Sequence, residues 1–489
     1  MNIDKIKICN PPLSIIKDLS IKMNLPLYLV GGYIRDFLVN RESNDYDFAI
    51  KGDALSFAQK VAEVLGGTFI LLEKERGTAR VVCKLKNQTL NLDFNNLKGE
   101  NISEDLQMRD FTINALAIDL TSANIELIDK NNGVQDLQEK IIRIISPNTF
   151  QDDPLRMLRA VRLCCKLGFE IEKDTCSTIV KSKGLISNVS AERITNEIYL
   201  ILSSKNSSFF ITHFDKLGLF EEIIPEIIPL KEIKQNGYHH LSVFEHSIAT
   251  LAQLEGIVSS LERLFPGWHN EIRKYLNEPI TKEHNRLVNL KLISLFHDIG
   301  KYETMTQEIS GKIRFIGHEI LGAKISSKIA SRLKLGTKEK KMMGLIIRNH
   351  MRPGYLIQAP TITNRALHRF FRDMGQEGIS SLLLTLADRY ATLGQKVSPE
   401  DLHKYYQTIN NMIDKFYSPS QTIMPPKILK GSEIMEHFGL PSGPLIGKLL
   451  REVEEAFVDK KIKNKQEALE FLASSLKIMV TVTLFLFYA

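Results

Sequence analysis

The sequence has few cysteines, and their spacing fits neither a disulfide framework nor a zinc site. The chain of 489 residues contains five, an odd number without any C-x-x-C pair, which argues against a small secreted domain held by disulfides. Their neighbours are largely apolar. We therefore expect reduced thiols in a cytoplasmic protein, at positions Cys9, Cys83, Cys164, Cys165 and Cys176.

A long apolar run is also missing. The first ten residues lack the apolar core of a signal peptide. The stretch 480–489 is nearly all apolar, but it is too short to span a bilayer as a helix. We expect no membrane partner, and we interpret 480–489 as a packed or frayed tail whose role the residues do not reveal.

The overall composition is that of an ordinary globular protein with a mild positive charge. Hydrophobic residues make up 43% and charged residues 25% of the chain. The net charge of +7 is compatible with a polyanionic partner without establishing one. Because single cores stop growing near ~250–300 residues, a chain of this length should form several domains.

The apolar pattern changes character along the chain. Up to about residue 145 strand-like and helical segments alternate, and from Asp152 onward the pattern is helical, with breaks at pairs such as Asn236-Gly237 and Pro353-Gly354. This order predicts an α+β fold with a mixed N-terminal layer and an all-helical remainder. The predicted N-terminal elements are strands at 27–30, 68–72, 79–85 and 89–95 and helices at 33–39 and 54–65.

The most informative stretch is 27–50, where a predicted buried strand ends at Gly31-Gly32 and a short helix begins. Paired glycines let a ligand approach the backbone, and a helix start offers free N–H groups to phosphates. The chain then reaches Asp45-Tyr46-Asp47. Because strand side chains alternate, Asp45 and Asp47 share one face. This combination favours a triphosphate site with Mg²⁺ over a solvated turn.

Three further segments carry polar groups where a core is expected. Asp93 lies on a predicted strand and is a candidate third metal carboxylate. Arg109, Asp110 and Asn114 flank buried positions, and polar groups in such a segment need partners that a nucleotide would provide. Asp153 and Arg156 are three residues apart at the expected start of a long helix. We predict that they share a helical face, as a base-reading pair or as a common ion pair.

These motifs occur together and in order as GGYIRD, DYDF, RGTAR, RDFTINALAID, NNGVQDL and DDPLRMLRAVR. Jointly they resemble the class II tRNA nucleotidyltransferase and bacterial poly(A) polymerase family of the DNA polymerase β superfamily, over about residues 25–220. The resemblance implies that Asp45 and Asp47 are catalytic and hold Mg²⁺. It also implies that Gly31, Gly32 and Arg35 contact the triphosphate.

The same resemblance assigns the rest of the nucleotide site. Arg109 and Asp110 would help bind nucleotide and select ribose, and Asp153 and Arg156 would recognise the base. Asn114 and Arg159 are further candidate nucleotide-binding residues. Two positions depart from the family pattern. Met108 replaces an arginine, which removes one phosphate-contacting charge, and Asp152 replaces a glutamate, which is a mild change because the base-reading residues remain.

A second constellation lies in the middle of the chain. A lone histidine on an apolar helix is usually a core residue, but the order H…HD…H…H…D followed by Ile-Gly-Lys resembles the HD phosphohydrolase superfamily. The resemblance implies a divalent metal (Mn, Ni, Mg or Fe) that supports phosphate-ester hydrolysis, although some HD domains are structural. Its implied ligands are His246, His297, Asp298 and Asp388, with His318 and His350 for a second metal.

The resemblances divide the chain into four expected parts: a polymerase β-type nucleotidyltransferase head at 1–145, a helical neck at 146–225, an HD domain at 226–420 and RNA-supporting C-terminal helices at 421–489. The implied activity is template-independent transfer of CMP or AMP from CTP or ATP to the 3′ end of tRNA. Two alternatives are a poly(A) polymerase and an HD phosphohydrolase with an inactive transferase. Residue identities do not separate full CCA, CC-only and A-only addition, and they leave the oligomeric state open.

Overall fold

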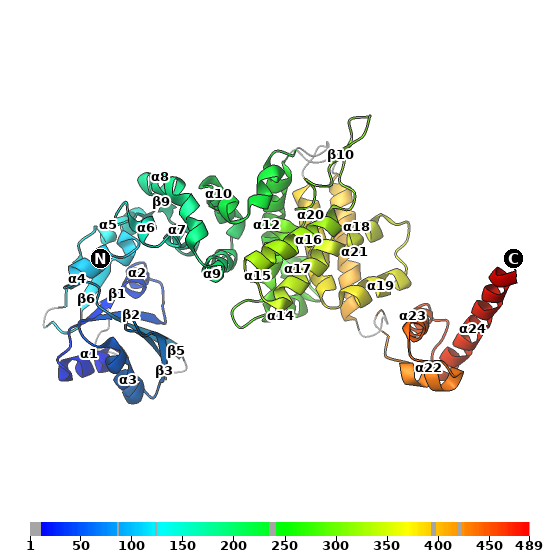
Figure 1. Ribbon diagram of the computed structural model, residues 1–489, viewed down its shortest axis with the longest axis horizontal. Coiled ribbons are helices and arrows are strands. Elements are labelled where there is room, and N and C mark those ends of the chain that lie inside the picture. Colours follow the sequence, from blue (N-terminus) through cyan, green and yellow to red (C-terminus); the bar gives the residue numbers. More distant parts are fainter. Residues whose placement is uncertain are drawn as a thin grey trace. The chain divides into compact units, whose positions relative to one another are not determined.

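The computed structural model describes most of the chain, and it forms two compact units. The described residues are 11–85, 88–122, 125–233, 241–392, 398–418, 423 and 425–488, with side chains up to 476. Cys9, the break at Asn236-Gly237 and the side chains of 480–489 lie outside them. The first unit comprises Met1–Ser204 with Thr212–Ile223, and the second comprises Lys205–Ile211 with Ile224–Ala489 (Figure 1).

The first unit is built on a seven-stranded sheet with strand order β3-β4-β5-β2-β1-β6-β7. All neighbouring strands are antiparallel except β2 and β5, which run parallel. Because β2 and β5 run parallel, two segments that are far apart in the sequence lie side by side in the same direction. The strands are β1 (Leu27–Val30), β2 (Asp45–Ile50), β3 (Thr68–Glu73), β4 (Thr78–Leu85), β5 (Gln88–Asn96), β6 (Leu116–Asp119) and β7 (Leu127–Asp129).

Local sequence explains where the early elements begin and end. β1 ends at Gly31, whose φ of 73° favours glycine, and helix α2 (Gly32–Leu38) follows directly. Helix α3 (Ala54–Leu65) begins where the Asp53 side chain accepts hydrogen bonds from the N–H groups of Leu55 and Ser56. It ends at Gly66 in the left-handed conformation. The strands and helices predicted for 27–95 are confirmed within one or two residues.

An aromatic cluster anchors the parallel strands to α3. Phe48 of β2 stacks on Phe94 of β5 with ring centroids 4.9 Å apart, and Phe57 of α3 meets Phe94 edge-on at 5.7 Å. All three side chains are fully buried. Burying such rings stabilises the fold by roughly 2 to 3 kcal/mol each. The cluster fixes β2 beside β5, and with them the polar residues at the strand starts.

The rest of the first unit is mainly helical. Arg162 of α7 donates to Glu197 of α9 at 2.6 Å, which joins the two longest helices of this part. The helices are α1 (Leu13–Lys22), α4 (Ile102–Gln107), α5 (Gly133–Glu139), α6 (Thr149–Asp152), α7 (Arg156–Leu167), α8 (Lys173–Ser182), α9 (Ala191–Leu202) and α11 (Leu219–Ile223). A short bridge of β8 (Ile141–Ile142) and β9 (Glu170–Ile171) accompanies them.

The second unit is almost entirely helical, as predicted. Its centre is formed by α12 (Val243–Ser259), α15 (Arg286–Phe296), α16 (His318–Arg332), α17 (Thr337–Asn349) and α20 (Glu377–Ala391). Around it lie α13 (Leu261–Leu264), α14 (His269–Asn277), α18 (Met351–Gln358), α19 (Asn364–Met374), α21 (Pro399–Tyr417), and a hairpin of β10 (Thr306–Gln307) and β11 (Ile313–Arg314). The predicted break at Pro353-Gly354 is wrong. The boundary lies at His350, and Pro353 occupies the first turn of α18, where its missing N–H costs nothing.

Three helices complete the chain, namely α22 (Gly431–Phe438), α23 (Pro444–Val458) and α24 (Lys465–Tyr488). Their small core includes Ile434, Leu449, Val453 and Leu472. Within the described part of the chain, every helix falls short of the length and apolarity that crossing a bilayer requires. The four described cysteines are free thiols, in agreement with the expected absence of disulfides among them.

Candidate functional site

Three carboxylates lie near one another on two neighbouring parallel strands of the sheet. Asp45 and Asp47 occupy alternate positions of β2, and β5 runs beside it in a register that pairs Asp45 with Asn91 and Asp47 with Asp93. Asn91 donates to Asp45 Oδ1 at 2.8 Å. Arg80 of β4 binds Asp93 in a bidentate ion pair, with Nε to Oδ1 at 2.7 Å and Nη2 to Oδ2 at 2.8 Å. The candidate third carboxylate therefore lies beside the predicted pair, already partnered by a cation.

The Gly31-Gly32 turn faces the same carboxylates. A side chain built at Gly31 would lie 3.3 Å from Asp47 Oδ2 and 3.1 Å from Arg109 Nη1, and one built at Gly32 would lie 3.7 Å from Asp47 Oδ2. Only glycine combines this crowding with the positive φ at residue 31. The turn thus brings bare backbone, a guanidinium and a carboxylate to one point, which is an arrangement suited to phosphate and metal chemistry.

The charge balance at Asp47 favours a bound cation. Burial raises the pKa of the Asp47 carboxyl, and the neighbouring carboxylate of Asp93 raises it further, while Arg109 and the Gly32 N–H oppose this shift. A carboxylate in such a position ionises readily only when a positive charge compensates its neighbours. Oxygen donors clustered in this way are the donor set of Mg²⁺, so the residues present fit a magnesium ion.

A chain of polar contacts connects four of the predicted nucleotide-binding residues. Arg35 Nη1 donates to Asn114 Oδ1 at 2.6 Å, and Asn114 Nδ2 donates to Asp110 Oδ1 at 2.9 Å. Asp110 Oδ2 forms an ion pair with Arg159, whose Nη2 lies 2.8 Å away. Although burial opposes ionisation of Asp110, Arg159 and Asn114 hold the pKa of its carboxyl below the usual value. These contacts hold the guanidinium groups of Arg35 and Arg159, which are more than a hundred residues apart in the sequence.

Asp153 and Arg156, the remaining predicted pair, do not share a helical face. Helix α7 begins at Arg156, and Asp153 precedes it in an extended conformation. The prediction that both lie on one helical face is wrong, because Pro154 disfavours the helical conformation at the residue before it. Asp153 Oδ2 instead accepts from Arg193 Nη2 at 2.8 Å, and Arg156 Nη2 donates to the Met108 carbonyl at 2.7 Å.

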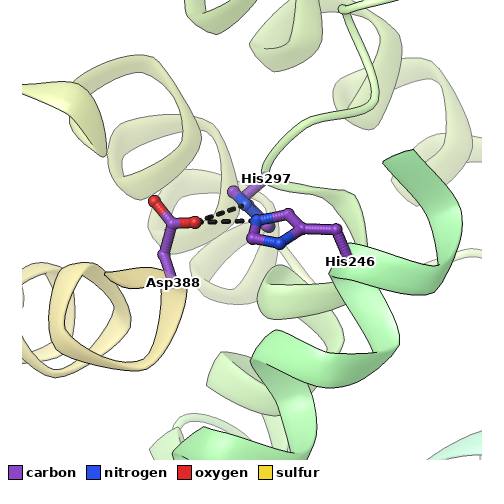
Figure 2. Close-up of side chains that lie close together, drawn as sticks. All are labelled: His246, His297 and Asp388. Atoms are coloured by element: carbon purple, nitrogen blue, oxygen red, sulfur yellow. Dashed lines mark hydrogen bonds and ion pairs between the residues drawn. The ribbon is translucent and has the colours of Figure 1, made fainter. Parts of the chain in front are cut away.

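The second unit contains a separate cluster of histidines and aspartates. His246 of α12, His297 at the end of α15 and Asp388 of α20 point toward one another (Figure 2). His246 Nε2 lies 2.8 Å and His297 Nε2 lies 3.8 Å from Asp388 Oδ1. Their candidate ligand atoms all lie within 4.8 Å of one another, which is close enough to share one metal ion.

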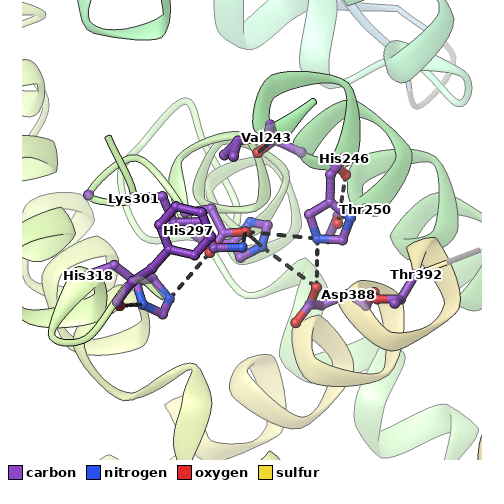
Figure 3. A network of polar contacts seen from close by, with 12 residues as sticks. Val243, His246, Thr250, His297, Lys301, His318, Asp388 and Thr392 are labelled. Atoms are coloured by element: carbon purple, nitrogen blue, oxygen red, sulfur yellow. Dashed lines mark hydrogen bonds and ion pairs between the residues drawn. The ribbon is translucent and has the colours of Figure 1, made fainter. Parts of the chain in front are cut away.

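A second trio adjoins the first through Asp298. Its Oδ1 lies 3.4 Å from His318 Nε2 and 3.8 Å from His350 Nε2, and its Oδ2 lies 3.3 Å from His297 Nε2. Figure 3 shows how His246, His297, His318 and Asp388 converge in one polar network. Asp298 thus presents one oxygen to each trio. The structure brings all six residues of the predicted second centre together.

The backbone around this centre orients the imidazoles. His297, His318 and His350 each place Nδ1 within 2.8 Å of the carbonyl three residues earlier, at Ser294, Phe315 and Ile347 respectively. This contact makes Nδ1 the donor and leaves Nε2 free to act as a metal ligand. Gly300 lets the segment that follows His297 approach the start of α16 closely. A Cβ atom at residue 300 would lie only 2.2 Å from the His318 carbonyl oxygen.

The electrostatics of the cluster agree with a site for cations. Burial favours neutral His297, but the carboxylates of Asp298 and Asp388 raise its pKa to about 9. Burial and the charge at His297 lower the pKa of His350 to about 4. A cavity of about 820 Å³ opens onto the centre and is lined by Asp298, His318, His350 and Asp388. Residues of this type and geometry can hold a divalent metal beside a small phosphate ester.

Sequence reasoning did not identify several contacts at the two sites. Arg80, the last residue of the RGTAR motif, was not singled out, yet it neutralises Asp93. Lys301 Nζ lies 2.7 Å from Asp298 Oδ2 and borders the cavity. Both lysine and arginine were visible in the RGTAR and HDIGK strings. Their partners depend on strand register and on helix packing, which local patterns do not determine.

Comparisons with known proteins cover most of the chain. Family models match residues 27–143 (Poly A polymerase head domain), 168–230 ("Probable RNA and SrmB- binding site of polymerase A"), 243–393 (HD domain) and 376–473 (tRNA nucleotidyltransferase domain 2).

Relatives resemble the chain over nearly its whole length. The A-adding tRNA nucleotidyltransferase of Deinococcus radiodurans is 31% identical over 451 residues, covering 91% of this chain and 94% of that protein. The CC-adding tRNA nucleotidyltransferase of Thermus thermophilus is 29% identical, covering 92% and 95%. The Thermotoga maritima CCA-adding enzyme complexed with tRNA has a similar fold, with a TM-score of 0.63 at 20% identity over 96% of this chain and 97% of that one. The chain belongs to the tRNA nucleotidyltransferase family, whose members are metal-dependent.

Proposed function

We propose that this chain transfers CMP, AMP or both from CTP and ATP to the 3′ end of tRNA. The observation that carries the proposal is the meeting of Asp45 and Asp47 with the Gly31-Gly32 turn beside Arg109. The relatives support the substrate, because they are named for adding A or CC to tRNA. A solved structure of similar fold is titled as a CCA-adding enzyme with CTP.

The head residues have distinct proposed roles. Asp45 and Asp47 hold Mg²⁺, and Asp93 shapes the charge around them. When bound, Mg²⁺ neutralises phosphate oxygens and favours an in-line attack of the RNA 3′-hydroxyl on the α-phosphorus. As the new P–O bond forms, the hydroxyl proton passes to solvent, and the bond between the α-phosphorus and the bridging oxygen breaks so that pyrophosphate leaves. Arg109 and the Gly32 backbone lie where they can bind the departing phosphates.

Nucleotide selection is assigned to residues of the head and the neck. The chain of contacts from Arg35 to Arg159 holds Asp110 and Asn114 in place for the ribose. Asp153 and Arg156 are proposed to read the base. In this structure their hydrogen-bonding groups are engaged by Arg193 and by the Met108 carbonyl. To bind a base, Asp153 and Arg156 must therefore give up these hydrogen bonds. A nucleotide whose base does not replace them with equally good hydrogen bonds would be rejected.

A second function is supported by the histidine–aspartate centre. Two trios that share Asp298 beside a cavity of about 820 Å³ are a suitable setting for metal-dependent hydrolysis of a phosphate ester. Mn, Ni, Mg or Fe would suit these nitrogen and oxygen ligands, and the ligands alone do not select among them.

The test of the transferase proposal uses purified protein and tRNA ending at the discriminator base, at C or at CC. CTP and ATP are supplied separately. Extension of one of these ends by one or two defined residues supports the proposal and identifies CC, A or CCA addition. Addition of many adenylates to unrelated RNA would favour a poly(A) polymerase, and no extension of any end would refute the transferase assignment.

A further inference from the structure

Arg80, Asp93 and Asp47 form a row across three neighbouring strands of the head. The register pairs Arg80 of β4 with Asp93 of β5, and it pairs Asp93 in turn with Asp47 of β2. Residues that lie opposite each other in a sheet project to the same side, so the three side chains share one face. Neighbouring strands are about 4.8 Å apart. The Asp93 carboxylate therefore lies between a guanidinium on one side and a proposed metal ligand on the other.

The guanidinium of Arg80 engages both oxygens of Asp93. Its Nε donates to Oδ1 at 2.7 Å and its Nη2 donates to Oδ2 at 2.8 Å. Such a bidentate contact is among the strongest pairings that a carboxylate makes with a side chain. The pair is not buried, because the side chain of Arg80 is 40% exposed and that of Asp93 is 22% exposed. An arriving ion can thus reach Asp93, but it finds both oxygens already engaged.

Asp45 and Asp47 are held differently. Asp45 Oδ1 accepts from the neutral side-chain amide of Asn91 at 2.8 Å. Arg109 attracts Asp47, but its own Nε and Nη2 donate to Asp105 Oδ2 at 3.0 and 2.8 Å. Among the contacts of the described residues, Asp93 is the one carboxylate of the three that a guanidinium holds by both oxygens.

Arg80 and a metal ion would compete for Asp93. A guanidinium that is bound to a carboxylate opposes the approach of a dication, both by its charge and by the hydrogen bonds that the ion would have to replace. Arg80 also interacts with the whole carboxylate group. Its hydrogen bonds to Asp93 raise the pKa of the Arg80 guanidinium, and the charges of Asp45 and Asp47 raise it further.

We infer that Arg80 is a positioning residue that withholds Asp93 from the metal, so that the head binds its catalytic ion through two carboxylates and not three. The inference rests on the proposed function, which assigns the ion to Asp45 and Asp47. Mg²⁺ held by two carboxylates completes its shell with water and substrate phosphates. The ion would therefore be retained mainly together with a nucleotide triphosphate. A third carboxylate would retain it without nucleotide and would repel the triphosphate.

The test measures manganese binding to the full-length protein without nucleotide or RNA. The EPR signal of free Mn²⁺ is followed during a titration. Arg80→Met removes the guanidinium and should tighten manganese binding roughly 10-fold, the scale on which groups that contact metal-site residues change metal affinity. The histidine–aspartate centre is unaltered in every variant, so any ions that it binds are common to all of them.

Two further variants separate the role of Asp93 from that of charge alone. Arg80→Met/Asp93→Asn removes the freed carboxylate and should return the manganese affinity to that of the wild type. Arg80→Lys keeps the charge but cannot make the bidentate contact, so it should show part of the gain. It also answers the question if Arg80→Met does not fold. A gain that persists without Asp93, or no gain in Arg80→Lys, would overturn the inference.

A matched control removes a cation from the same face of the same strand. Lys84 is exposed on β4, four residues after Arg80 and opposite Thr89. Lys84→Met should leave the manganese affinity unchanged. An equal gain in this control would assign the effect to the general charge of the sheet face, and unchanged affinity in Arg80→Met would also overturn the inference.

Direct contact between Arg80 and the nucleotide is the competing role. Binding of CTP is therefore measured without metal by equilibrium dialysis. Arg80→Met/Asp93→Asn removes both members of the ion pair and leaves the net charge unchanged, so it should bind CTP as tightly as the wild type. Weaker binding by this double variant would place Arg80 on the phosphates and overturn the inference.

These measurements are independent of nucleotide transfer. A wild-type protein that adds no nucleotide to any tRNA end would refute the proposed function, whereas the manganese titrations would still show whether Arg80 withholds Asp93. Conversely, an active enzyme whose manganese affinity does not respond to Arg80→Met would refute only the role of Arg80.

Discussion

Asp47 and Asp93 lie directly opposite each other on the parallel strands β2 and β5. Arg80 neutralises Asp93, whereas Asp47 faces the Gly31-Gly32 turn and Arg109. Two carboxylates at adjacent register positions repel each other unless cations intervene. Burial raises the pKa of the Asp47 carboxyl and the neighbouring Asp93 raises it further, which explains why this point attracts a metal ion.

Replacing Asp47 should abolish nucleotide transfer without unfolding the protein. Asp47→Ala removes a proposed metal ligand and also one of the mutually repelling carboxylates, so the thermal stability of the metal-free protein should not fall. We expect incorporation of CMP and AMP to drop at least ~1000-fold, a loss typical of removing transition-state charge stabilisation. Incorporation of radiolabelled nucleotide into tRNA measures it.

The matched control is Asp18→Ala, at an exposed position of α1 far along the chain from the carboxylate cluster. It should transfer at the wild-type rate. Appreciable extension by Asp47→Ala at saturating Mg²⁺ would contradict the assigned role of Asp47.

Removing Asn114 should weaken nucleotide binding through its neighbours. Asn114→Ala leaves Arg35 without its 2.6 Å acceptor and removes one of the donors to Asp110. Burying unsatisfied groups costs about 1 to 3 kcal/mol, and misplaced neighbours should raise the KM for CTP and ATP roughly 10-fold. Both nucleotides should be affected equally, because this chain of contacts is proposed to hold the sugar and not the base.

Steady-state kinetics with each nucleotide give the two KM values. Asn101→Ala, which removes the cap of α4, serves as a control for a purely structural loss of similar size. A change in KM confined to one nucleotide would place Asn114 in base recognition instead.

The sequence was most informative where function depends on neighbours along the chain. The glycine turn, the strand that follows it and the shared face of Asp45 and Asp47 follow from local rules of backbone conformation. The position of Asp93 beside Asp47 was only a candidate, because it depends on the parallel register of β2 and β5. The prediction that Asp153 and Arg156 share a helical face was wrong for a local reason, because Pro154 disfavours the helical conformation at Asp153.

Long-range packing accounts for what the sequence left out. The order of histidines and aspartates in the second unit predicted the six residues that the structure brings together, but not that Asp298 joins two trios or that Lys301 borders them. Arg365, Arg369 and Arg372 are spaced so that they share one face of α19. The convergence of this face with Lys448 and Arg451 depends on the packing of α19 against α23.

The two trios predict two metal ions in the second unit. His318→Ala should halve the content of tightly bound manganese and strongly reduce hydrolysis of a generic phosphodiester, since one trio loses a nitrogen ligand. Elemental analysis of protein equilibrated with Mn²⁺ and then desalted measures the content. Nucleotide transfer should remain at the wild-type rate, because the proposed transferase residues lie in the other unit.

His269→Ala, which changes a histidine outside both trios, should leave the metal content unchanged. Equal manganese content in wild type and His318→Ala would restrict the centre to a single ion at His246, His297 and Asp388.

Glu455 should make the stability of the second unit sensitive to acid. Hydrogen bonds from Arg369 and then Arg365 lower the pKa of Glu455 to about 2, against the opposing effect of burial. Because the folded-state pKa lies below the unfolded value, the stabilisation is complete above about pH 4.5 and is lost as pH falls toward 2. Glu455→Gln should therefore lower the melting temperature at pH 7 by several degrees, corresponding to about 2 kcal/mol. The difference between variant and wild type should shrink steadily below pH 4.5. Glu436→Gln, at an exposed position of α22, should show no such pH-dependent difference, and a gap for Glu455→Gln that stays constant down to pH 2 would contradict the ion-pair explanation.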